Sequence, residues 1–292
     1  MKIALTGATG LVGHWAAGHL LGHGHAVTTL GRGPSRHAGA AHLTYDLNGN
    51  PPDLAGCEVL IHAALAHVPG RFRGGEGADA PGFLRSNLDG TIRLFTAARD
   101  AGVGRIVLLS SRAVYDGYPA GTVLADGMAA RPDTLYAQVK DQAEQALRAM
   151  ATPGLAVASL RATGVYAPPV AGMDHKWRGL VAGFARGDRM APHAGTEIHA
   201  LDLAEAIRLL ATVDAAALEP FSFNLSDFLL DRRDMLAEFA QLSGCDGPLP
   251  DAAEAGQISV MTTERIAALG WRGRGRAGLT ETLAALAEEL RG

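Results

Sequence analysis

The stretch KIALTGATGLVG, residues 2–13, decides the fold of this chain. It opens with a short apolar run, which is typical of a buried β-strand, and a helical pattern follows at 11–24. Between the two, one glycine permits a tight turn, another lets backbone N–H groups approach a phosphate, and the last lets helix and strand pack closely. We therefore predict a dinucleotide-binding turn, formed by Gly7, Thr9, Gly10, Leu11, Val12 and Gly13.

The same alternation of short apolar runs and helical patterns continues beyond this turn. Continuous apolar strands separated by helices indicate a parallel sheet that is covered on both faces. Right-handed crossovers then give a doubly wound α/β fold of the Rossmann type. The expected strands are 2–7, 25–32, 43–47, 58–64, 105–111 and 155–162, and the expected helices are 11–24, 82–102 and 134–151.

After about residue 165 the pattern loosens. Helices are expected at 173–187, 200–213, 231–243 and 278–290, and a strand at 221–225 could rejoin the sheet. We therefore predict a dinucleotide-binding Rossmann domain at 1–165 and a smaller, mostly helical substrate-binding region at 166–292, of which about 197–225 returns to the Rossmann core. The glycine-rich segment 70–82 is a candidate mobile flap.

Composition excludes several classes of protein. Apolar residues make up 48% of the 292 residues and charged residues 19%, which is typical of a soluble globular protein. A net charge of −4 argues against a nucleic-acid partner. No apolar run of membrane-spanning length occurs, and a glycine at position 7 interrupts the only candidate for a signal-peptide core. Two isolated cysteines, Cys57 and Cys245, suit a reducing cytoplasm.

Eleven histidines invite a metal interpretation, but the spacing does not favour one. His23 and His25 lie in GHGHAV, which has the pattern of a turn between a helix and a strand, and no HExxH motif occurs. We therefore expect no metal site.

The end of the second strand bears on the choice of cofactor. An acidic residue there is typical of sites that prefer NAD, but this chain has Gly31 followed by Arg32. A guanidinium suits a 2′-phosphate because it forms forked, charge-assisted hydrogen bonds. We therefore expect NADP, with NAD as the alternative. Asp46, followed by Leu47, either accepts a hydrogen bond from the adenine amino group or is simply an exposed acid at a strand end.

Two further motifs carry chemistry. LLSSRAVYDG places Ser110 and Ser111 at the carboxyl end of a strand, where open α/β sheets bind ligands. LYAQVK places Tyr136 and Lys140 four residues apart, on one face of a helix. Alone, this pair would be taken for an ordinary surface pair.

With these motifs together, the chain resembles the extended short-chain dehydrogenases/reductases, in the NAD(P)-dependent epimerase/dehydratase-like branch. The resemblance is close over about 1–170. It rests on TGATGLVG, IHAA (61–64), SNLDGTIRLFTAA (86–98), SSRAVYDG (110–117), YAQVK (136–140) and LRATGVYAPP (160–169).

The resemblance implies a role for each motif residue. Tyr136 would be the general acid/base, Ser111 would hold the substrate oxygen, and Lys140 would hold the nicotinamide ribose. A free tyrosine has a pKa of about 10, and a nearby lysine cation lowers it by favouring the phenolate. The small side chains of Ala63 and Ala64 would border the cofactor. Asn87 either supports the cofactor side of the site or makes a structural hydrogen bond within its helix.

The C-terminal motif departs from the family pattern. His199 and Asp202 match an aromatic–V–H–V–D–D run, but Gly195, Thr196 and Glu197 stand where nucleotide-sugar enzymes carry an arginine that meets the diphosphate. A carboxylate there would repel a diphosphate. A substitute cation would have to come from the following residues, which otherwise form a solvated helix face: Lys176, Arg178, Arg186 and Arg189.

Two enzyme functions therefore remain open. The first is an NAD(P)-dependent oxidoreductase that transfers hydride at a carbonyl or hydroxyl carbon of a small molecule. The alternative is a nucleotide-sugar epimerase that holds NAD(P) tightly and uses it transiently. A catalytically silent dinucleotide-binding protein is disfavoured because Tyr136 and Lys140 are both present. The helices at 82–102 and 134–151 resemble those that pair in dimers of this superfamily, so we expect a homodimer.

Overall fold

The computed structural model describes residues 1–68 and 75–291. Its centre is a parallel sheet of seven strands in the order β10–β7–β5–β4–β1–β2–β3. The strands are β1 (Lys2–Thr6), β2 (Ala26–Gly31), β3 (Ala41–Thr44), β4 (Val59–His62), β5 (Arg105–Ser111), β7 (Ala156–Ala162) and β10 (Ser222–Leu225). The Rossmann-type doubly wound fold expected from the sequence is confirmed.

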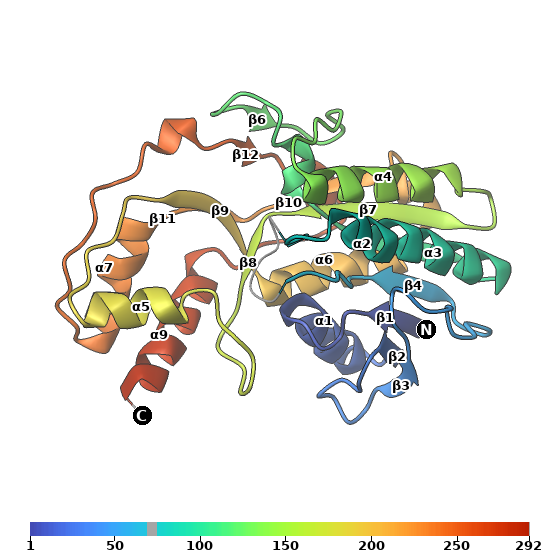
Figure 1. Cartoon of the computed structure of the whole chain (residues 1–292), viewed down its shortest axis with the longest axis horizontal. Helices are drawn as coiled ribbons and strands as arrows, with labels where there is room; N and C mark the ends of the chain where they lie inside the picture. The colour runs from blue at the N-terminus through green and yellow to red at the C-terminus, as the bar shows by residue number, and fades with distance from the viewer. Residues whose placement is uncertain (69–74, 292) are drawn as a thin grey trace.

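Helices cover both faces of this sheet (Figure 1). On one face lie α1 (Leu11–Gly22) and α6 (Ala200–Thr212), and on the other lie α3 (Gly90–Asp100) and α4 (Leu135–Ala149). Successive side chains of a strand point to opposite faces, so Ile3 and Leu5 of β1 pack in the cluster under α1 and α6. Ala4, between them, packs with Phe95 under α3. This two-sided burial is why the strands read as continuous apolar runs.

The helix expected at 82–102 is interrupted. It consists of a short α2 (Ala80–Leu84), a π-helical turn at Arg85–Asp89, and α3. π-helical turns inside α-helices are rare and frequently occur at functional sites. Residues 70–74 of the predicted flap lie outside the described residues.

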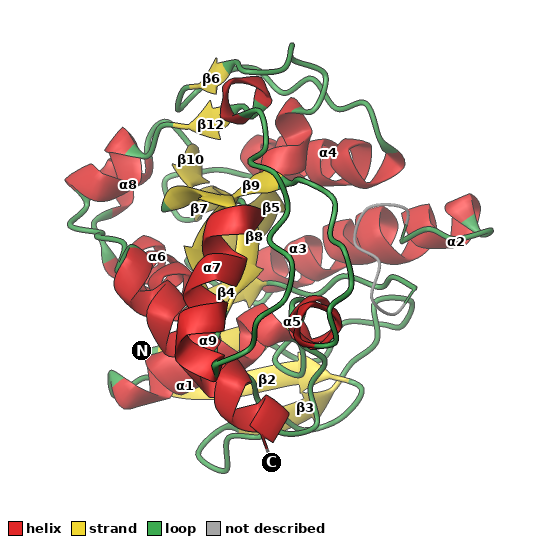
Figure 2. Cartoon of the chain, turned by 90° about the vertical axis from the view of Figure 1, so that its left-hand side faces the viewer, coloured by secondary structure: helices red, strands yellow, loops and turns green. Residues whose placement is uncertain are grey.

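The rest of the chain is mostly helical, as expected, and also contributes strands to two small sheets. The helices α5 (Arg178–Ala185), α7 (Arg232–Ser243) and α9 (Arg276–Arg291) lie at one end of the molecule, with α7 and α9 side by side (Figure 2). A three-stranded sheet accompanies them, in the order β11 (Phe228–Asp231), β9 (Ala194–His199) and β8 (Gly164–Tyr166). Two short pieces, β6 (Val123–Leu124) and β12 (Val260–Met261), pair with each other, and α8 (Glu264–Ala268) follows β12.

Two boundaries differ from the sequence prediction. The strand expected at 43–47 runs from Ala41 to Thr44, so Asp46 lies in the turn after β3 rather than at its end. The helix expected at 173–187 is only α5, Arg178–Ala185. No helix of the described part of the chain is long and apolar enough to span a membrane.

Candidate active site

A cavity of about 1030 Å³ opens at the carboxyl ends of the parallel strands. This is where the strand order reverses, because β1 lies between β4 on one side and β2 on the other. Open α/β sheets bind ligands at such a switch point. All but one of the sequence-predicted site residues line the cavity, and the exception is Asn87.

The glycine turn forms one wall of the cavity. Gly7 has φ +77°, which L side chains rarely adopt, and a Cβ there would lie 2.7 Å from the Ala63 backbone. At Gly13 a Cβ would lie 2.1 Å from the Gly7 oxygen. Glycine is therefore required at both positions, Gly7 in the turn and Gly13 in the first turn of α1, which begins at Leu11. The N-terminus of a helix presents unpaired backbone N–H groups and favours an anion such as a pyrophosphate.

The second wall follows β4, and a buried histidine fixes it. The Thr6 hydroxyl accepts hydrogen bonds from the backbone N–H groups of Ala63 and Ala64, each at 3.1 Å. The same hydroxyl lies 2.8 Å from Nδ1 of His62. Since β1 and β4 are neighbours in the sheet, these bonds hold the 63–64 backbone against the glycine turn.

The direction of hydrogen bonding around His62 can be assigned. The Thr91 hydroxyl donates to the Asn87 carbonyl at 2.7 Å, so it must accept from Nε2–H of His62, 2.9 Å away. Nδ1 then accepts from Thr6. Complete burial lowers the pKa of His62 to about 3, and the Lys140 cation acts in the same direction. The ring is therefore neutral at ordinary pH.

Asn87 acts on the cavity indirectly. From the π-helical turn, its amide accepts from the Ala66 N–H and donates to the Ala66 carbonyl, both at 2.7 Å. The Asn87 amide also donates to the Phe83 carbonyl at 3.1 Å. This two-way bond holds the strand-to-helix loop after β4, whose residues Ala63 to His67 line the cavity.

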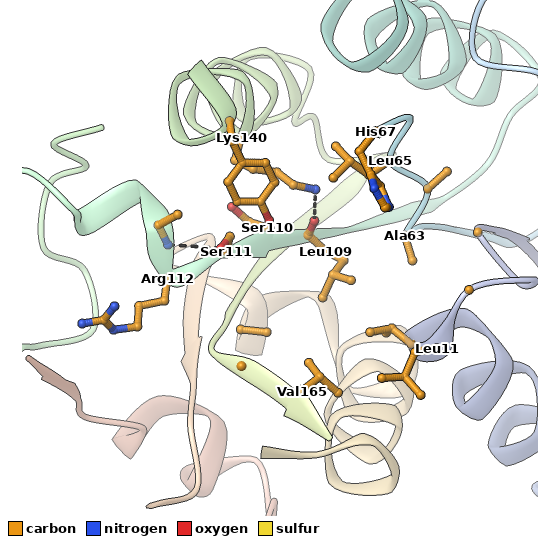
Figure 3. Close-up of a pocket in the computed structure, with 18 of the residues that line it drawn as sticks. Leu11, Ala63, Leu65, His67, Leu109, Ser110, Ser111, Arg112, Lys140 and Val165 are labelled. Atoms are coloured by element: carbon orange, nitrogen blue, oxygen red, sulfur yellow. Dashed lines mark hydrogen bonds between the residues drawn. The ribbon is translucent and has the colours of Figure 1, made fainter. Parts of the chain in front are cut away.

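Lys140 reaches from α4 to β5 at the centre of the site (Figure 3). Its ammonium group donates to the Leu109 carbonyl at 2.8 Å, and the residue is only 7% exposed. Burial lowers the pKa of Lys140 to about 8, against the opposing effect of Glu144. Tyr136 lines the same cavity from the first turn of α4, which Thr134 caps by accepting from the Ala137 N–H.

The two serines at the end of β5 have different surroundings. The Ser111 hydroxyl accepts from the Ala113 N–H at 3.1 Å, and a hydroxyl that accepts one bond still has its own hydrogen to donate (Figure 3). Ser110 is buried, and among the described residues its hydroxyl has no hydrogen-bond partner. Both line the cavity, so geometry alone does not choose between them.

At the other end of the cavity, Arg32 and Asp46 lie beyond β2 and β3. Both are exposed and both line the cavity, as does the buried Leu47. The carboxylate of Asp46 accepts from the Asn48 N–H at 2.9 Å, which fixes the turn. A guanidinium is therefore present at the strand end where an adenosine ribose would lie.

The cations considered as diphosphate ligands do not reach the cavity. None of Lys176, Arg178, Arg186 and Arg189 lines it. Lys176 instead pairs with the largely buried Glu197, and Arg178 pairs with Glu289 at 2.9 Å. The charge of Glu197 is compensated by Lys176, and Glu197 does not line the cavity. The expected repulsion between this carboxylate and a bound diphosphate is therefore not supported.

Sequence reasoning missed several further residues that line the cavity. They come from scattered segments: Arg112, Tyr118, His193, Gln257 and Ser259. Arg112 donates to the Ser259 carbonyl at 2.9 Å, which joins β5 to a segment far along the chain. Only Arg112 carried a signal in the sequence, because it follows Ser111 directly.

A parallel Rossmann sheet, a glycine turn after its first strand, and serine, tyrosine and lysine side chains converging beyond β5 define the class of short-chain dehydrogenases/reductases. A sequence model of the NAD dependent epimerase/dehydratase family matches residues 3–226. The chain belongs to this family.

Two relatives with assigned activities differ in their chemistry. The chain is 31% identical over 171 residues to a UDP-glucose 4-epimerase of Corynebacterium glutamicum, covering 55% of this chain and 50% of the relative. It is also 31% identical over 175 residues to a 4-hydroxy-2-methyl-3-oxo-4-farnesyl-3,4-dihydroquinoline-1-oxide ketoreductase of Stigmatella aurantiaca, covering 55% and 49%. The chain spans about half the length of these curated relatives.

Among solved structures, the fold is similar along the whole chain. The structure of MoeE5 in complex with UDP-glucose and NAD has a TM-score of 0.78 and 26% identity, covering 100% of this chain and 99% of the other. A nicotinamide dinucleotide is thus the cofactor of the family and of this structural neighbour.

Proposed function

We propose that the protein is an NAD(P)-dependent oxidoreductase that transfers hydride at a carbonyl or hydroxyl carbon. The observation that carries the proposal is Lys140, a buried ammonium one helical turn from Tyr136, at the carboxyl end of β5 and in the cavity that the glycine turn borders. A lysine is costly to bury unless its charge serves a purpose.

In the reduction, the cofactor and the side chains of this protein supply different groups. When NAD(P)H is bound, it supplies the hydride to the carbonyl carbon. Tyr136 donates its proton to the carbonyl oxygen, which becomes the product hydroxyl, and the Lys140 cation stabilises the phenolate that remains. Ser111 donates a hydrogen bond to the same oxygen, so charge that develops there is stabilised. The oxidation runs through the same positions in reverse.

Replacement of the tyrosine tests this assignment. We expect Tyr136→Phe to lower kcat by about 10²–10⁴-fold, the usual contribution of a general acid, while the Kd for NADPH or NADH changes less than about threefold. Tyr118→Phe is the matched control, because Tyr118 also lines the cavity but donates to the Ala129 carbonyl. Retained turnover in a folded, cofactor-binding Tyr136→Phe protein would remove Tyr136 from the mechanism.

Replacing each of the two neighbouring serines in turn tests which hydroxyl holds the substrate oxygen. We expect Ser111→Ala to lower kcat by about 10²-fold or more, as the loss of one donor to a developing oxyanion does. Ser110→Ala should leave kcat within about threefold. The opposite ranking would assign the substrate oxygen to Ser110.

The second candidate is a nucleotide-sugar epimerase. The Corynebacterium relative and MoeE5 with UDP-glucose support it, and the Stigmatella ketoreductase supports the first candidate. A turnover screen with simple carbonyl compounds and UDP-sugars distinguishes them. Net consumption of NAD(P)H with a carbonyl compound supports the reductase, whereas interconversion of UDP-sugars without net consumption supports the epimerase.

Three further proposals complete this assignment. NADP is preferred over NAD because Arg32 is available to a 2′-phosphate, and the protein acts in the cytoplasm, where two free cysteines remain reduced. A substrate-binding region begins at about residue 166.

A homodimer through α3 and α4 also remains a proposal. Small side chains on these two helices would permit close packing with a second copy. Ala98 and Ala143 are buried in the chain's own core, whereas Ala97 and Ala146 are partly exposed. Light scattering that gives a single-chain mass across a wide concentration range would contradict the dimer.

A further inference from the structure

We propose that the chain binds a divalent transition-metal ion between α1 and α6, at His19, His23 and Glu205. These helices pack side by side on one face of the main sheet (Figure 1). The proposal is independent of the hydride-transfer site. Eight residues of helix separate His19 from Leu11 at the glycine turn, which is about 12 Å along the axis.

The three side chains already converge. His19 and His23 are four residues apart on α1, so they share one face, and Glu205 meets them from α6. A ring nitrogen of each histidine and a carboxylate oxygen of Glu205 all lie within 4.8 Å of one another. Tetrahedral zinc with bonds of 2.0–2.1 Å places its ligands about 3.4 Å apart, so the three side chains would adjust by rotation when the ion binds.

Hydrogen bonds orient His23 for metal binding. Its Nδ1 lies 2.8 Å from the His19 carbonyl, which can only accept, so Nδ1 carries the hydrogen. Nε2 of the neutral ring then has a free lone pair. An Nδ1–H bond to a backbone carbonyl is the usual way in which a metal-ligating histidine is held.

A forked ion pair holds Glu205 in place. Arg208 donates to both of its carboxylate oxygens, at 2.6 and 2.7 Å. The oxygen nearest His19 lies 2.8 Å from Nε2 of that ring. Because a carboxylate can only accept, this nitrogen now carries a hydrogen, and a metal ion would displace it as a proton and bridge the same two atoms.

The donor set and the charge select the class of metal. Two imidazoles and one carboxylate are a set that zinc accepts, with water in the fourth position. Arg208 offsets the charge of Glu205, so the neutral imidazoles must supply most of the affinity. Borderline metals such as Zn²⁺ and Ni²⁺ are therefore favoured, and Mg²⁺ and Ca²⁺, which need several charged or carbonyl oxygens, are not.

The site is open to an entering ion. The His19 side chain is 19% exposed and the Glu205 side chain 30%. A second cavity of about 330 Å³ borders the two histidines, and His14 and His37 lie stacked in its wall with ring centroids 4.5 Å apart. The sequence prediction that no metal binds was based on the pair His23 and His25. In the structure, the geometry of α1 places His23 next to His19 instead.

Titration calorimetry on tag-free, chelator-stripped protein tests the proposal with ZnCl₂ and, separately, MgCl₂. We expect one zinc ion per chain with a Kd of about 10 µM or tighter, and no saturable magnesium binding at the same concentrations. His19→Gln and His23→Gln should each weaken zinc binding more than about tenfold, because each removes a ligand.

His37→Gln is the matched control. His37 lines the same cavity, but its Nε2 is held 2.8 Å from the His14 carbonyl, so zinc affinity should change less than about threefold. Zinc should also raise the melting temperature of the wild type by several degrees and leave that of His23→Gln unchanged. Absence of saturable zinc binding, equal weakening by His37→Gln, or unchanged affinity in a folded His23→Gln protein would overturn the proposal.

Discussion

At the scale of single residues, Lys140 is the most constrained group of the candidate site. Its ammonium is almost fully buried and donates a hydrogen bond to the Leu109 carbonyl, and the carboxylate of Glu144, one turn further along α4, partly offsets its charge. Burial disfavours the charged form, which is why the pKa falls to about 8. The proposed role of Tyr136 needs the lysine cation, and this charge is therefore expected to be lost close to the pH of ordinary assays.

This predicts an alkaline limb in the pH profile. The pKa of Lys140 in the folded protein lies below its usual value, so as pH rises through about 8 the lysine loses its proton and no longer favours the phenolate. We expect kcat/KM for the cofactor, which reports groups of the free enzyme, to fall above about pH 8. In Lys140→Arg, whose guanidinium keeps its charge, the limb should move at least one pH unit upward. An unmoved limb would assign it to another group.

Arg32 carries the prediction on cofactor choice. A carboxylate at this position repels a 2′-phosphate and accepts hydrogen bonds from ribose hydroxyls. We therefore expect Arg32→Asp to raise the ratio of Kd for NADPH to Kd for NADH at least about tenfold, measured by fluorescence titration. Arg36→Ala is the control, because Arg36 donates to the Gly172 carbonyl and does not line the cavity. An unchanged ratio in Arg32→Asp would contradict the role of Arg32.

At the scale of elements, one chain of hydrogen bonds joins β1, β4 and the π-helical turn. It runs from Thr6 through the His62 ring to Thr91 and ends on the Asn87 carbonyl. Each group donates to the next in a single direction, so no member can be removed without leaving a buried partner unsatisfied. The wall of the cavity at Ala63 and Ala64 thus depends on a histidine that does not line it.

The neutral ring of His62 predicts sensitivity to acid. Its pKa is lowered to about 3 in the folded protein, whereas an unfolded histidine titrates near 6.5. Between these values the unfolded chain binds one proton more, so the free energy of unfolding falls as pH falls, by at most about 1.4 kcal/mol per pH unit. Urea unfolding of His62→Gln should show a shallower dependence between pH 6 and 4. His42→Gln, at the partly exposed edge strand β3, should keep the wild-type dependence.

The sequence could predict the strands of the main sheet because a strand that is buried on both faces consists of an unbroken run of apolar residues. The β8–β9–β11 sheet escaped prediction because its strands are short and mix glycine and charge with apolar residues, as Ala194–His199 shows. The π-helical turn escaped because Arg85–Asp89 preserves the helical periodicity around it. Motif spacing could place Tyr136 and Lys140 together, but no local pattern could bring Ser259 beside Arg112.

At the scale of the whole molecule, Asp202 of α6, which packs on the main sheet, holds the segment 271–274 that leads into α9. This residue lies in the first turn of α6, where a negative charge suits the helix dipole. Its carboxylate accepts from the backbone N–H and the side chain of Arg274, both at 2.9 Å. The Asp202 carbonyl accepts from the Trp271 indole at 2.8 Å. Asp202, the second residue that matches the family motif after His199, therefore has a structural role.

We expect Asp202→Ala to lower the free energy of unfolding by about 1–3 kcal/mol, because it leaves a backbone donor and a half-buried guanidinium without their acceptor. The urea midpoint measures the change, and Asp251→Ala, at an exposed loop position, is the control. An equal midpoint in both variants would show that the contact contributes nothing to stability.

The position of β10 at the edge of the main sheet has a consequence for biosynthesis. Its partner β7 ends at Ala162, and β10 begins at Ser222, about sixty residues later. At translation rates of roughly 5–20 residues per second, the ribosome needs about 3–12 seconds to deliver the strand that covers this edge. Throughout that interval a nascent chain presents the unpaired edge of an apolar strand, so this sheet is most open to pairing with another chain before its own synthesis is finished.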